Sequence, residues 1–230
     1  MDEPQGCAVV IPCLDEGAVI GSLVEQVRRQ VPAVLVIDDG SRDDTAAVAT
    51  AAGAEVLRHP GTQGKGAALG TGLKAIAARN LAWAITMDGD GQHDPEDIPA
   101  FLARAKATDA TLVVGNRMHE PLAIPWVRRA VNRWMSRRLS RRAGMNLPDS
   151  QCGFRLINLK AWSGLRLTTR HFEVESETLM AFVAAGQRIE FVPIRVIGRG
   201  PRSHIRPVVD TLRWWRWWRG SSGSKQRPVG

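Results

Sequence analysis

Short apolar runs alternate with longer segments of helical character through the first half of the chain. Runs of this length, rich in β-branched residues, predict buried strands, here at 8–11, 34–37, 54–57, 82–87 and 112–115. Helical spacing or helix-start signals fill the intervals, at 16–30, 45–52, 65–79 and 95–107. This alternation predicts an α/β fold, with a mostly parallel central sheet and helices on both faces.

The second half has a different pattern. Helices are predicted at 126–142, which is dense in arginine, at 175–185 and at 208–219, and a strand at 189–196. Residues 149–155 are polar, and the Gly/Ser-rich residues 221–230 are predicted to be disordered. No run of about 18 apolar residues occurs, so we expect no segment to span a bilayer.

Polar signatures follow three of the predicted strands, at 14–16, 38–41 and 88–92. In an open parallel sheet, ligands bind beyond the carboxyl ends of the strands. We therefore expect these three segments to meet at one edge of the sheet and to form the functional site.

Asp88 and Asp90 are the strongest candidates for chemistry. Side chains alternate in direction along an extended segment, so carboxylates separated by one residue lie on the same side. Gly89 between them lets the backbone pass close to a ligand. Two carboxylates suit Mg²⁺ or Mn²⁺, which also bind oxygens of substrate phosphates, and Gln92 could add a ligand. The alternative is a solvated acidic turn.

Two further segments suit a nucleotide. Asp39 follows the second strand, where an acid can accept hydrogen bonds from a base or a ribose; the alternative is a turn that caps the next helix through Ser41 or Asp44. Lys65 stands in a glycine-rich loop, HPGTQGKGAALG at 59–70, directly before a helix. Backbone N–H groups and a lysine can neutralise phosphate there, although the spacing is not that of a P-loop. The alternative is a lysine in solvent.

Six segments, taken in order, resemble the family-two glycosyltransferases, most closely the dolichol-phosphate mannose synthase group and its bacterial polyprenyl-phosphate relatives. The matching segments are VVIPCLDE at 9–16, VIDDGSRDDT at 36–45, GKGAAL at 64–69, TMDGDGQHDPED at 86–97, GNR at 115–117 and DSQCGFR at 149–155. They cover most of residues 7–205. The resemblance implies a GT-A fold, a nucleoside-diphosphate sugar donor, a Mg²⁺ or Mn²⁺ cofactor and inversion at the anomeric carbon.

The resemblance also implies roles for individual residues. The segment that contacts the nucleotide corresponds to Pro12, Leu14 and Glu16, and the pair that recognises the base corresponds to Ile37 and Asp39. The D-x-D motif corresponds to Asp88, Gly89 and Asp90, and the metal ligands correspond to Asp90 and Gln92 together with Asp88. Arg117 corresponds to an arginine that binds phosphate. Leu14 stands where the family usually has an aromatic residue. The late basic motif reads RGPRSHI at 199–205, so we expect Arg199 and Arg202 to share the diphosphate and His204 to replace a lysine.

The chemistry depends on the acceptor. A phosphate acceptor is already ionised at neutral pH and needs no strong general base. A hydroxyl acceptor needs one, and the candidates are Asp149, Glu173 and Glu175. The residues predicted to take part in catalysis are Asp88, Asp90, Arg117 and Asp149, with Lys65 as an additional donor contact.

Charge and tryptophan content indicate a membrane. The formal charge is +8 and the pI about 10.4, which favours partners rich in phosphate. On a helical wheel, the tryptophans of the last helix occupy one arc and its arginines the other, as in helices that lie in an anionic interface. The helix at 126–142 mixes apolar residues with seven arginines. The alternative for both helices is that the tryptophans pack on the protein itself. We expect a peripheral protein at the cytoplasmic face of the cell membrane, with a polyprenyl-phosphate or other lipid-linked acceptor.

The predicted organisation is a glycosyltransferase domain at 1–206, an amphipathic helix at 207–219 and a tail at 220–230. Within the domain, a nucleotide-sugar half covers about 7–117 and an acceptor half about 118–206. Three cysteines do not suggest a disulfide framework, so we expect a reducing, cytoplasmic location.

Two other functions stay open. A nucleotidyltransferase also uses carboxylates, metal and a nucleotide, but we would expect a Gly/Lys-rich loop directly after its first strand. A basic nucleic-acid-binding module would explain the charge but not the acidic strand ends, which repel phosphate when no metal is bound. We therefore expect no nucleic-acid partner.

Overall fold

The computed structural model describes residues 6–118, 125–197 and 207–220. Their strands form one sheet, consisting of β1 (Cys7–Cys13), β2 (Val34–Asp38), β3 (Glu55–Arg58), β4 (Trp83–Thr86), β5 (Leu112–Asn116), β6 (Arg155–Asn158) and β7 (Ile189–Pro193). The order across the sheet is β3-β2-β1-β4-β6-β5-β7. The sheet therefore runs without interruption across the predicted boundary between the nucleotide-sugar half and the acceptor half, and that division stays a prediction.

The central strands are apolar because helices cover both of their faces. β1 and β2 are buried along nearly their whole length. β1 is parallel to β2 and to β4, with Val10 opposite Leu35 on one side and Thr86 on the other. Since the three strands are parallel, their carboxyl ends lie at the same edge of the sheet. The predicted mostly parallel α/β fold is confirmed.

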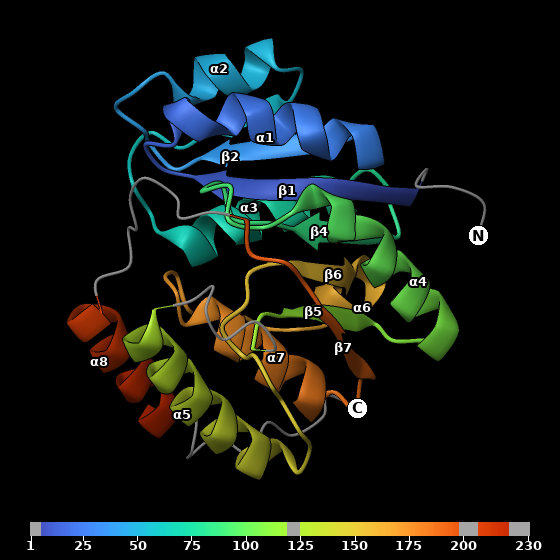
Figure 1. The fold of residues 1–230 in the computed structure, drawn as a ribbon, viewed down its shortest axis with the longest axis vertical. Coiled ribbons are helices and arrows are strands. Elements are labelled where there is room, and N and C mark those ends of the chain that lie inside the picture. The colour runs from blue at the N-terminus through green and yellow to red at the C-terminus, as the bar shows by residue number, and fades with distance from the viewer. Residues whose placement is uncertain (1–5, 119–124, 198–206, 221–230) are drawn as a thin grey trace.

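Four helices of the first half follow the predicted pattern. They are α1 (Gly17–Gln30), α2 (Thr45–Ala51), α3 (Lys65–Ala77) and α4 (Ile98–Thr108), the last preceded by a 3₁₀ turn, η2 (Pro95–Asp97). Figure 1 shows α1 and α4 on the near side of the sheet and α3 on the far side. α3 packs closely on β1 and β2, because a Cβ at Gly72 would meet Val10 at 2.3 Å and Ile37 at 3.1 Å.

The sequence pattern did not predict β6, which lies antiparallel between β4 and β5. Its residues, RLIN, begin with an arginine and follow a polar segment, so the apolar run is too short to indicate a strand. Arg155 is nonetheless buried, and its guanidinium donates to the backbone oxygens of Ser150, Cys152 and Glu175. A charged side chain that is satisfied by backbone carbonyls can lie in a core strand.

The remaining helices are α5 (Trp126–Ala143), α6 (Leu159–Ser163), α7 (Val174–Ala184) and α8 (Pro207–Gly220). Figure 1 shows α8, in red, beside α5. Trp214 is 2% exposed, and its indole N–H donates to Ser176 Oγ of α7 at 2.9 Å. Trp134 of α5 contacts the rings of Trp214 and Trp215. Of the two alternatives left open for the last helix, packing on the protein itself therefore describes Trp214, whose indole N–H finds a buried acceptor on α7, while Trp215, Trp217 and Trp218 are partly buried.

Candidate active site

The ends of β1 and β2 are joined by hydrogen bonds. The N–H of Asp15 donates to Ser41 Oγ at 2.9 Å, and the N–H of Arg42 donates to Asp15 Oδ1 at 2.7 Å. The N–H of Glu16 donates to Thr45 Oγ1 at 2.8 Å. Asp15 has a positive φ of 53°, a conformation that this hydrogen bonding supports. Two of the three polar segments predicted to converge therefore form one unit.

The third polar segment lies against the first. A Cβ on Gly89 would meet Cys13 Sγ at 2.5 Å, so only glycine fits beside the end of β1. We predicted that Gly89 makes room for a ligand; in the structure the space beside it is filled by Cys13. The close approach holds the Asp88–Asp90 segment next to β1.

Three carboxylates share this edge of the sheet. Burial and then the charge of Asp90 raise the pKa of Glu16 to about 7. Burial and then the charge of Asp88 raise the pKa of Asp90. Burial also disfavours ionisation of Asp88, but Lys65 and His93 outweigh it and hold the pKa of Asp88 well below its usual value. Asp90 and Glu16 thus face negative charge that a bound cation would relieve.

A divalent cation fits the donors at Asp90. The backbone N–H and the side-chain amide of Gln92 both donate to the Asp90 carboxylate, at 3.1 and 2.8 Å. Rotation of the Gln92 amide group by half a turn about its last side-chain bond would bring its carbonyl oxygen to the place of its NH₂ group. That oxygen is a hard ligand, as a carboxylate oxygen is. Among the described residues, no three His, Cys, Asp or Glu side chains form a metal cluster by themselves. Mg²⁺ typically takes one or two carboxylates and completes its shell with water and substrate phosphate, so the donor set suffices.

Lys65 lies inside the protein rather than in an open phosphate loop. Its Nζ is 2.6 Å from Asp88 Oδ1 and 2.6 Å from Glu175 Oε1, and it lies 5.5 Å from the centre of the Phe172 ring. The two carboxylates outweigh the effect of burial and raise the pKa of Lys65. Lys65 is therefore a fixed positive charge that joins the end of β4 to α7.

The backbone N–H groups at the start of α3 are already occupied. Those of Gly66 and Ala67 donate to Arg170 O, at 2.8 and 3.3 Å. A Cβ on Gly64 or Gly66 would meet the backbone oxygen of Arg170 or Thr169, at 2.4 and 2.7 Å. Our interpretation of this loop as a phosphate cradle is thus wrong for the helix N-terminus, and its glycines allow residues 169–170 to lie against α3.

Asp39 organises the loop that follows β3. Its carboxylate accepts from His59 Nδ1 at 2.7 Å and from the N–H groups of Gln63 and Gly64 at 3.0 and 2.8 Å. Asp39 is 4% exposed, and Ile37 is fully buried against α3. The pair predicted to recognise the base has these structural partners, and a base contact by Asp39 would have to share them. Pro12 and Leu14 are half-buried at the end of β1.

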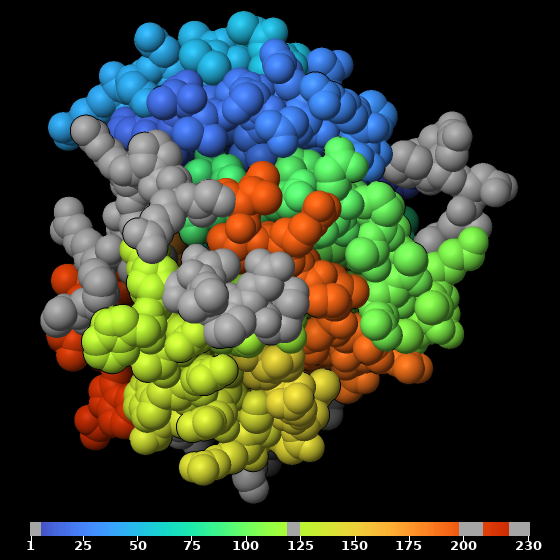
Figure 2. Space-filling model, viewed as in Figure 1, coloured from blue at the N-terminus to red at the C-terminus, as the bar shows by residue number. Residues whose placement is uncertain are grey.

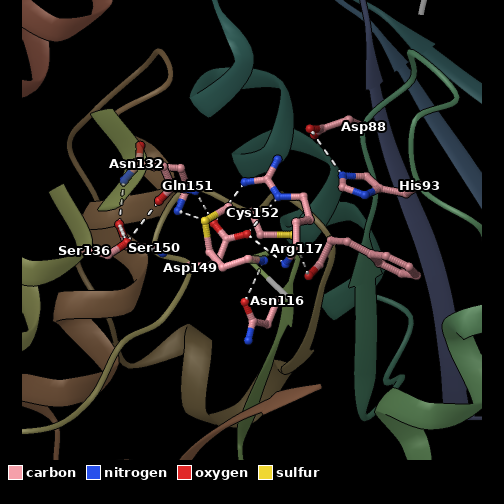
Figure 3. A network of polar contacts seen from close by, with 12 residues as sticks. Asp88, His93, Asn116, Arg117, Asn132, Ser136, Asp149, Ser150, Gln151 and Cys152 are labelled. Carbon is pink, nitrogen blue, oxygen red and sulfur yellow. Dashed lines mark hydrogen bonds and ion pairs between the residues drawn. The ribbon is translucent and has the colours of Figure 1, made fainter. Parts of the chain in front are cut away.

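Arg117 and Asp149 form a bidentate ion pair, drawn in Figure 3. Arg117 Nε and Nη2 lie 2.8 and 2.9 Å from the two carboxylate oxygens, and the N–H of Arg117 donates as well. Asn132 of α5 and the N–H of Gln151 also donate to Asp149. Although burial favours the neutral acid, Arg117 and Asn132 lower the pKa of Asp149.

This geometry does not suit the general-base role considered for Asp149. Asp149 is fully buried, both of its oxygens are engaged, and its lowered pKa makes it a weaker base. Arg117 keeps 19% of its side chain exposed. Asp149 is therefore a positioning residue, and the charge available to a ligand is that of the Arg117 guanidinium.

The predicted phosphate-binding residues Arg199, Arg202 and His204 lie outside the described residues. The chain that leads toward them is described up to Ile197, whose N–H donates to Gln92 O at 3.0 Å. Val196 forms an isolated antiparallel bridge with His93. The chain therefore passes directly beside the acidic motif.

Sequence reasoning missed several residues that hold the site together. Glu177 accepts from the N–H and hydroxyl groups of both Thr168 and Thr169, and so fixes the segment that covers the start of α3. Asn132 holds Asp149 from α5. Glu177 stands among the polar residues Glu175, Ser176 and Thr178 in the first half of α7, so nothing in the sequence indicated that it is buried and bonded to this segment.

Comparisons with known proteins identify the family of the chain. The family model described as "Glycosyl transferase family 2" matches residues 8–164. An uncharacterized glycosyltransferase of Mycobacterium tuberculosis is 32% identical over 198 residues, which cover 85% of each chain. A UDP-N-acetylglucosamine–dolichyl-phosphate N-acetylglucosaminyltransferase of Methanococcus voltae is 26% identical over 212 residues, covering 82% of this chain and 84% of the relative.

Solved structures share the fold. The glucosyl-3-phosphoglycerate synthase of M. tuberculosis superposes with a TM-score of 0.75 at 22% identity, over 97% of this chain and 83% of that one. The same enzyme solved with Mn²⁺ and UDP-glucose gives a TM-score of 0.72 at 24% identity, over 94% of this chain and 77% of that one. With the family model spanning most of the sheet, the sequence motifs and the GT-A architecture lead to one conclusion: the chain is a glycosyltransferase and belongs to glycosyl transferase family 2.

Proposed function

We propose that the protein transfers a sugar, with inversion, from a UDP-sugar to a lipid-linked phosphate acceptor in a reaction that depends on Mg²⁺ or Mn²⁺. The observation that carries the proposal is the cluster of Glu16, Asp88 and Asp90 at the joined strand ends, where burial and mutual repulsion raise the pKa of two of the three acids. Such a cluster is suited to a cation that in turn binds a diphosphate.

UDP is the favoured nucleotide. The structurally similar synthase of M. tuberculosis was solved with UDP-glucose and Mn²⁺, and the M. voltae relative is named for a UDP-sugar donor. Both likenesses support a uridine nucleotide for this chain without naming its sugar.

The leaving group requires charge stabilisation. As the bond to the anomeric carbon breaks, negative charge builds up on the nucleoside diphosphate, and a divalent cation at Asp90 and Gln92 would neutralise part of it. Lys65 already neutralises Asp88, which leaves Asp90 as the less compensated carboxylate of the pair. We therefore assign Asp90 as the main protein ligand and Asp88 as the residue that orders the segment.

The acceptor is proposed to be a polyprenyl phosphate because of what surrounds Arg117. Its guanidinium is held in place by Asp149 and partly exposed, which suits charge-assisted hydrogen bonds to a phosphate oxygen. A phosphate oxygen is already a nucleophile at neutral pH. The reaction therefore does not need Asp149 as a general base, and Asp149 can stay paired with Arg117. The dolichyl-phosphate acceptor in the name of the M. voltae relative supports the same class.

A transfer assay tests the proposal. UDP-, GDP- and dTDP-sugars are incubated with a short-chain polyprenyl phosphate and Mn²⁺, and the released nucleotide is identified by chromatography. We expect UDP together with a glycosylated lipid. Release of pyrophosphate would instead identify a nucleotidyltransferase, and no turnover with any donor, combined with tight oligonucleotide binding, would favour a nucleic-acid-binding protein.

A further inference from the structure

Exposed apolar side chains collect on two neighbouring helices. On α5 they are Trp126, Val127, Val131 and Trp134, which are 74, 49, 36 and 38% exposed. On α8 they are Val209 and Leu212, which are 40 and 53% exposed. We call these six residues the apolar strip. Six of the eight large hydrophobic residues found exposed in the described chain belong to it, so the exposure is concentrated on one part of the surface.

The two helices run in the same direction, so their first turns lie level. Trp134 contacts Trp214 and Trp215, and further along Arg142 lies 5.0 Å from the Trp218 ring. Later residues of α5 thus contact later residues of α8, which requires the two helices to be parallel, as Figure 1 also shows. Turn-by-turn pairing places the early residues of α5 beside the first turns of α8. The apolar strip is therefore one surface, and Figure 2 shows the side chains of α5, in yellow-green, at the surface beside α8, in red.

Positive charge is concentrated on the same two helices. α5 and α8 together contain ten arginines and one aspartate, a formal charge of +9, while the whole chain carries +8. All remaining residues therefore sum to −1. Arg133, Arg137 and Arg141 are exposed along α5. The net positive charge of the chain therefore comes from these two helices.

We propose that the apolar strip and the arginines around it dock the protein on an anionic bilayer, with the strip in the interface and the arginines at the lipid phosphates. Exposed indole and aliphatic groups flanked by arginine suit an interface that is apolar on one side and anionic on the other. A second copy of the chain does not fit, because two pairs of helices that each carry +9 would repel each other. Among the described residues, no helix is long and apolar enough to cross a membrane.

Docking in this orientation brings the lipid to the site, and in this respect it rests on the proposed function. Val131 is in the apolar strip, and Asn132, the next residue of α5, is buried and donates to Asp149 at 2.7 Å. Asp149 in turn holds Arg117. One helix, about 10 Å across, therefore separates the docking surface from the ion pair that faces the acceptor phosphate. This differs from docking by the tryptophans of α8, of which Trp214 is buried.

Vesicle co-sedimentation tests the docking surface. The full chain is mixed with vesicles of phosphatidylcholine alone or with one third phosphatidylglycerol, at 0.15 M salt. We expect sedimentation with the anionic vesicles and little with the neutral ones. The double variant Trp126→Ser, Val131→Ser removes exposed groups and should weaken binding by about tenfold or more, since apolar insertion contributes to binding strength.

Charge-matched variants separate this surface from general basicity. Arg133→Glu with Arg137→Glu on α5 should abolish sedimentation, whereas Arg104→Glu with Lys106→Glu on α4, an equal change of charge, should leave it intact. The proposal is overturned if both pairs of substitutions reduce vesicle binding equally, or if the serine variant binds as well as the original chain. It is also overturned if the original chain does not bind anionic vesicles, or if it binds an oligonucleotide in preference to them.

UDP binding in the presence of Mn²⁺, measured on the same variants by thermal shift, keeps the two proposals distinguishable. Loss of vesicle binding with UDP binding retained leaves the donor site in place. If the original chain binds vesicles but does not bind UDP, the proposed function is contradicted and the docking surface is still supported.

Discussion

Glu16 shows how the site changes the pKa of a single residue. It lies between β1 and α1, directly before the first residue of the helix, and is only 8% exposed, near Asp90 and Asp43. An acid in such surroundings favours its protonated form, and the pKa of Glu16 rises to about 7. The native protein then binds more protons than the unfolded chain between the ordinary pKa and 7, so the contribution of Glu16 to stability falls as pH rises through that interval.

Glu16→Gln should therefore raise the melting temperature at pH 8 in EDTA and change it little at pH 4, where the carboxyl is largely protonated in both states. Thermal unfolding followed across pH 4–8 measures this. Glu25→Gln, an exposed acid on the same helix, is the control and should show no such pH dependence. An equal effect of Glu16→Gln at both pH values would contradict the argument.

The Arg117–Asp149 pair predicts a large change in the free energy of unfolding. Asp149→Asn leaves a largely buried guanidinium without its carboxylate, and breaking such a pair costs about 3 kcal/mol or more. Glu55→Gln breaks the exposed pair with Arg79 and should cost less than about 1 kcal/mol. Urea unfolding compares the two variants, and similar small losses would show that the buried pair does not hold Arg117.

At the scale of elements, α3 is fixed by what lies on its first turn. Residues 169–170 pack against Gly64 and Gly66, and Glu177 holds Thr168 and Thr169 in place. Lys65 then connects Asp88 to Glu175 across the same junction. The glycine-rich loop is thus a joint between α3 and the segment before α7, and not an exposed phosphate cradle.

Two glycines of α3 should respond in opposite directions to alanine. Gly66→Ala places a Cβ 2.7 Å from Thr169 O, and we expect a loss of about 1–3 kcal/mol through overpacking. Gly70→Ala meets nothing within 4 Å, so helix propensity should stabilise it by about 0.5–1 kcal/mol. Chemical denaturation of both variants is the measurement, and destabilisation of both by the same amount would contradict this role for Gly66.

The sequence predicted much of the fold because most of its strands are continuous apolar runs between clear helix signals. β6 was missed because its short run begins with Arg155, whose burial depends on backbone carbonyls supplied by distant segments. The predicted convergence of strand ends appears in the hydrogen bonds from the N–H groups of Asp15 and Glu16 to Ser41, which follows β2, and Thr45, which begins α2. The partners of Lys65 and Asp149 could not be predicted, since they come from elements remote in sequence.

At the scale of the molecule, one edge of the sheet collects the acids and one pair of helices collects the arginines. The acids of β1 and β4 suit a cation and a diphosphate, while α5 connects the basic surface to Arg117 through Asn132 and Asp149. α5 is therefore the element that the proposed docking surface and the site share.

The central claim is that Asp90 holds a divalent cation to which the nucleotide diphosphate binds, and isothermal titration with UDP tests it most directly. We expect the original chain to bind UDP at least about tenfold more tightly in Mn²⁺ than in EDTA, because a ligand that shares a cation with the protein binds through it. Asp90→Asn, with its fold checked by circular dichroism, should lose this dependence on Mn²⁺. If Asp90→Asn binds UDP with the same affinity and the same response to Mn²⁺ as the original chain, the account of the site is wrong.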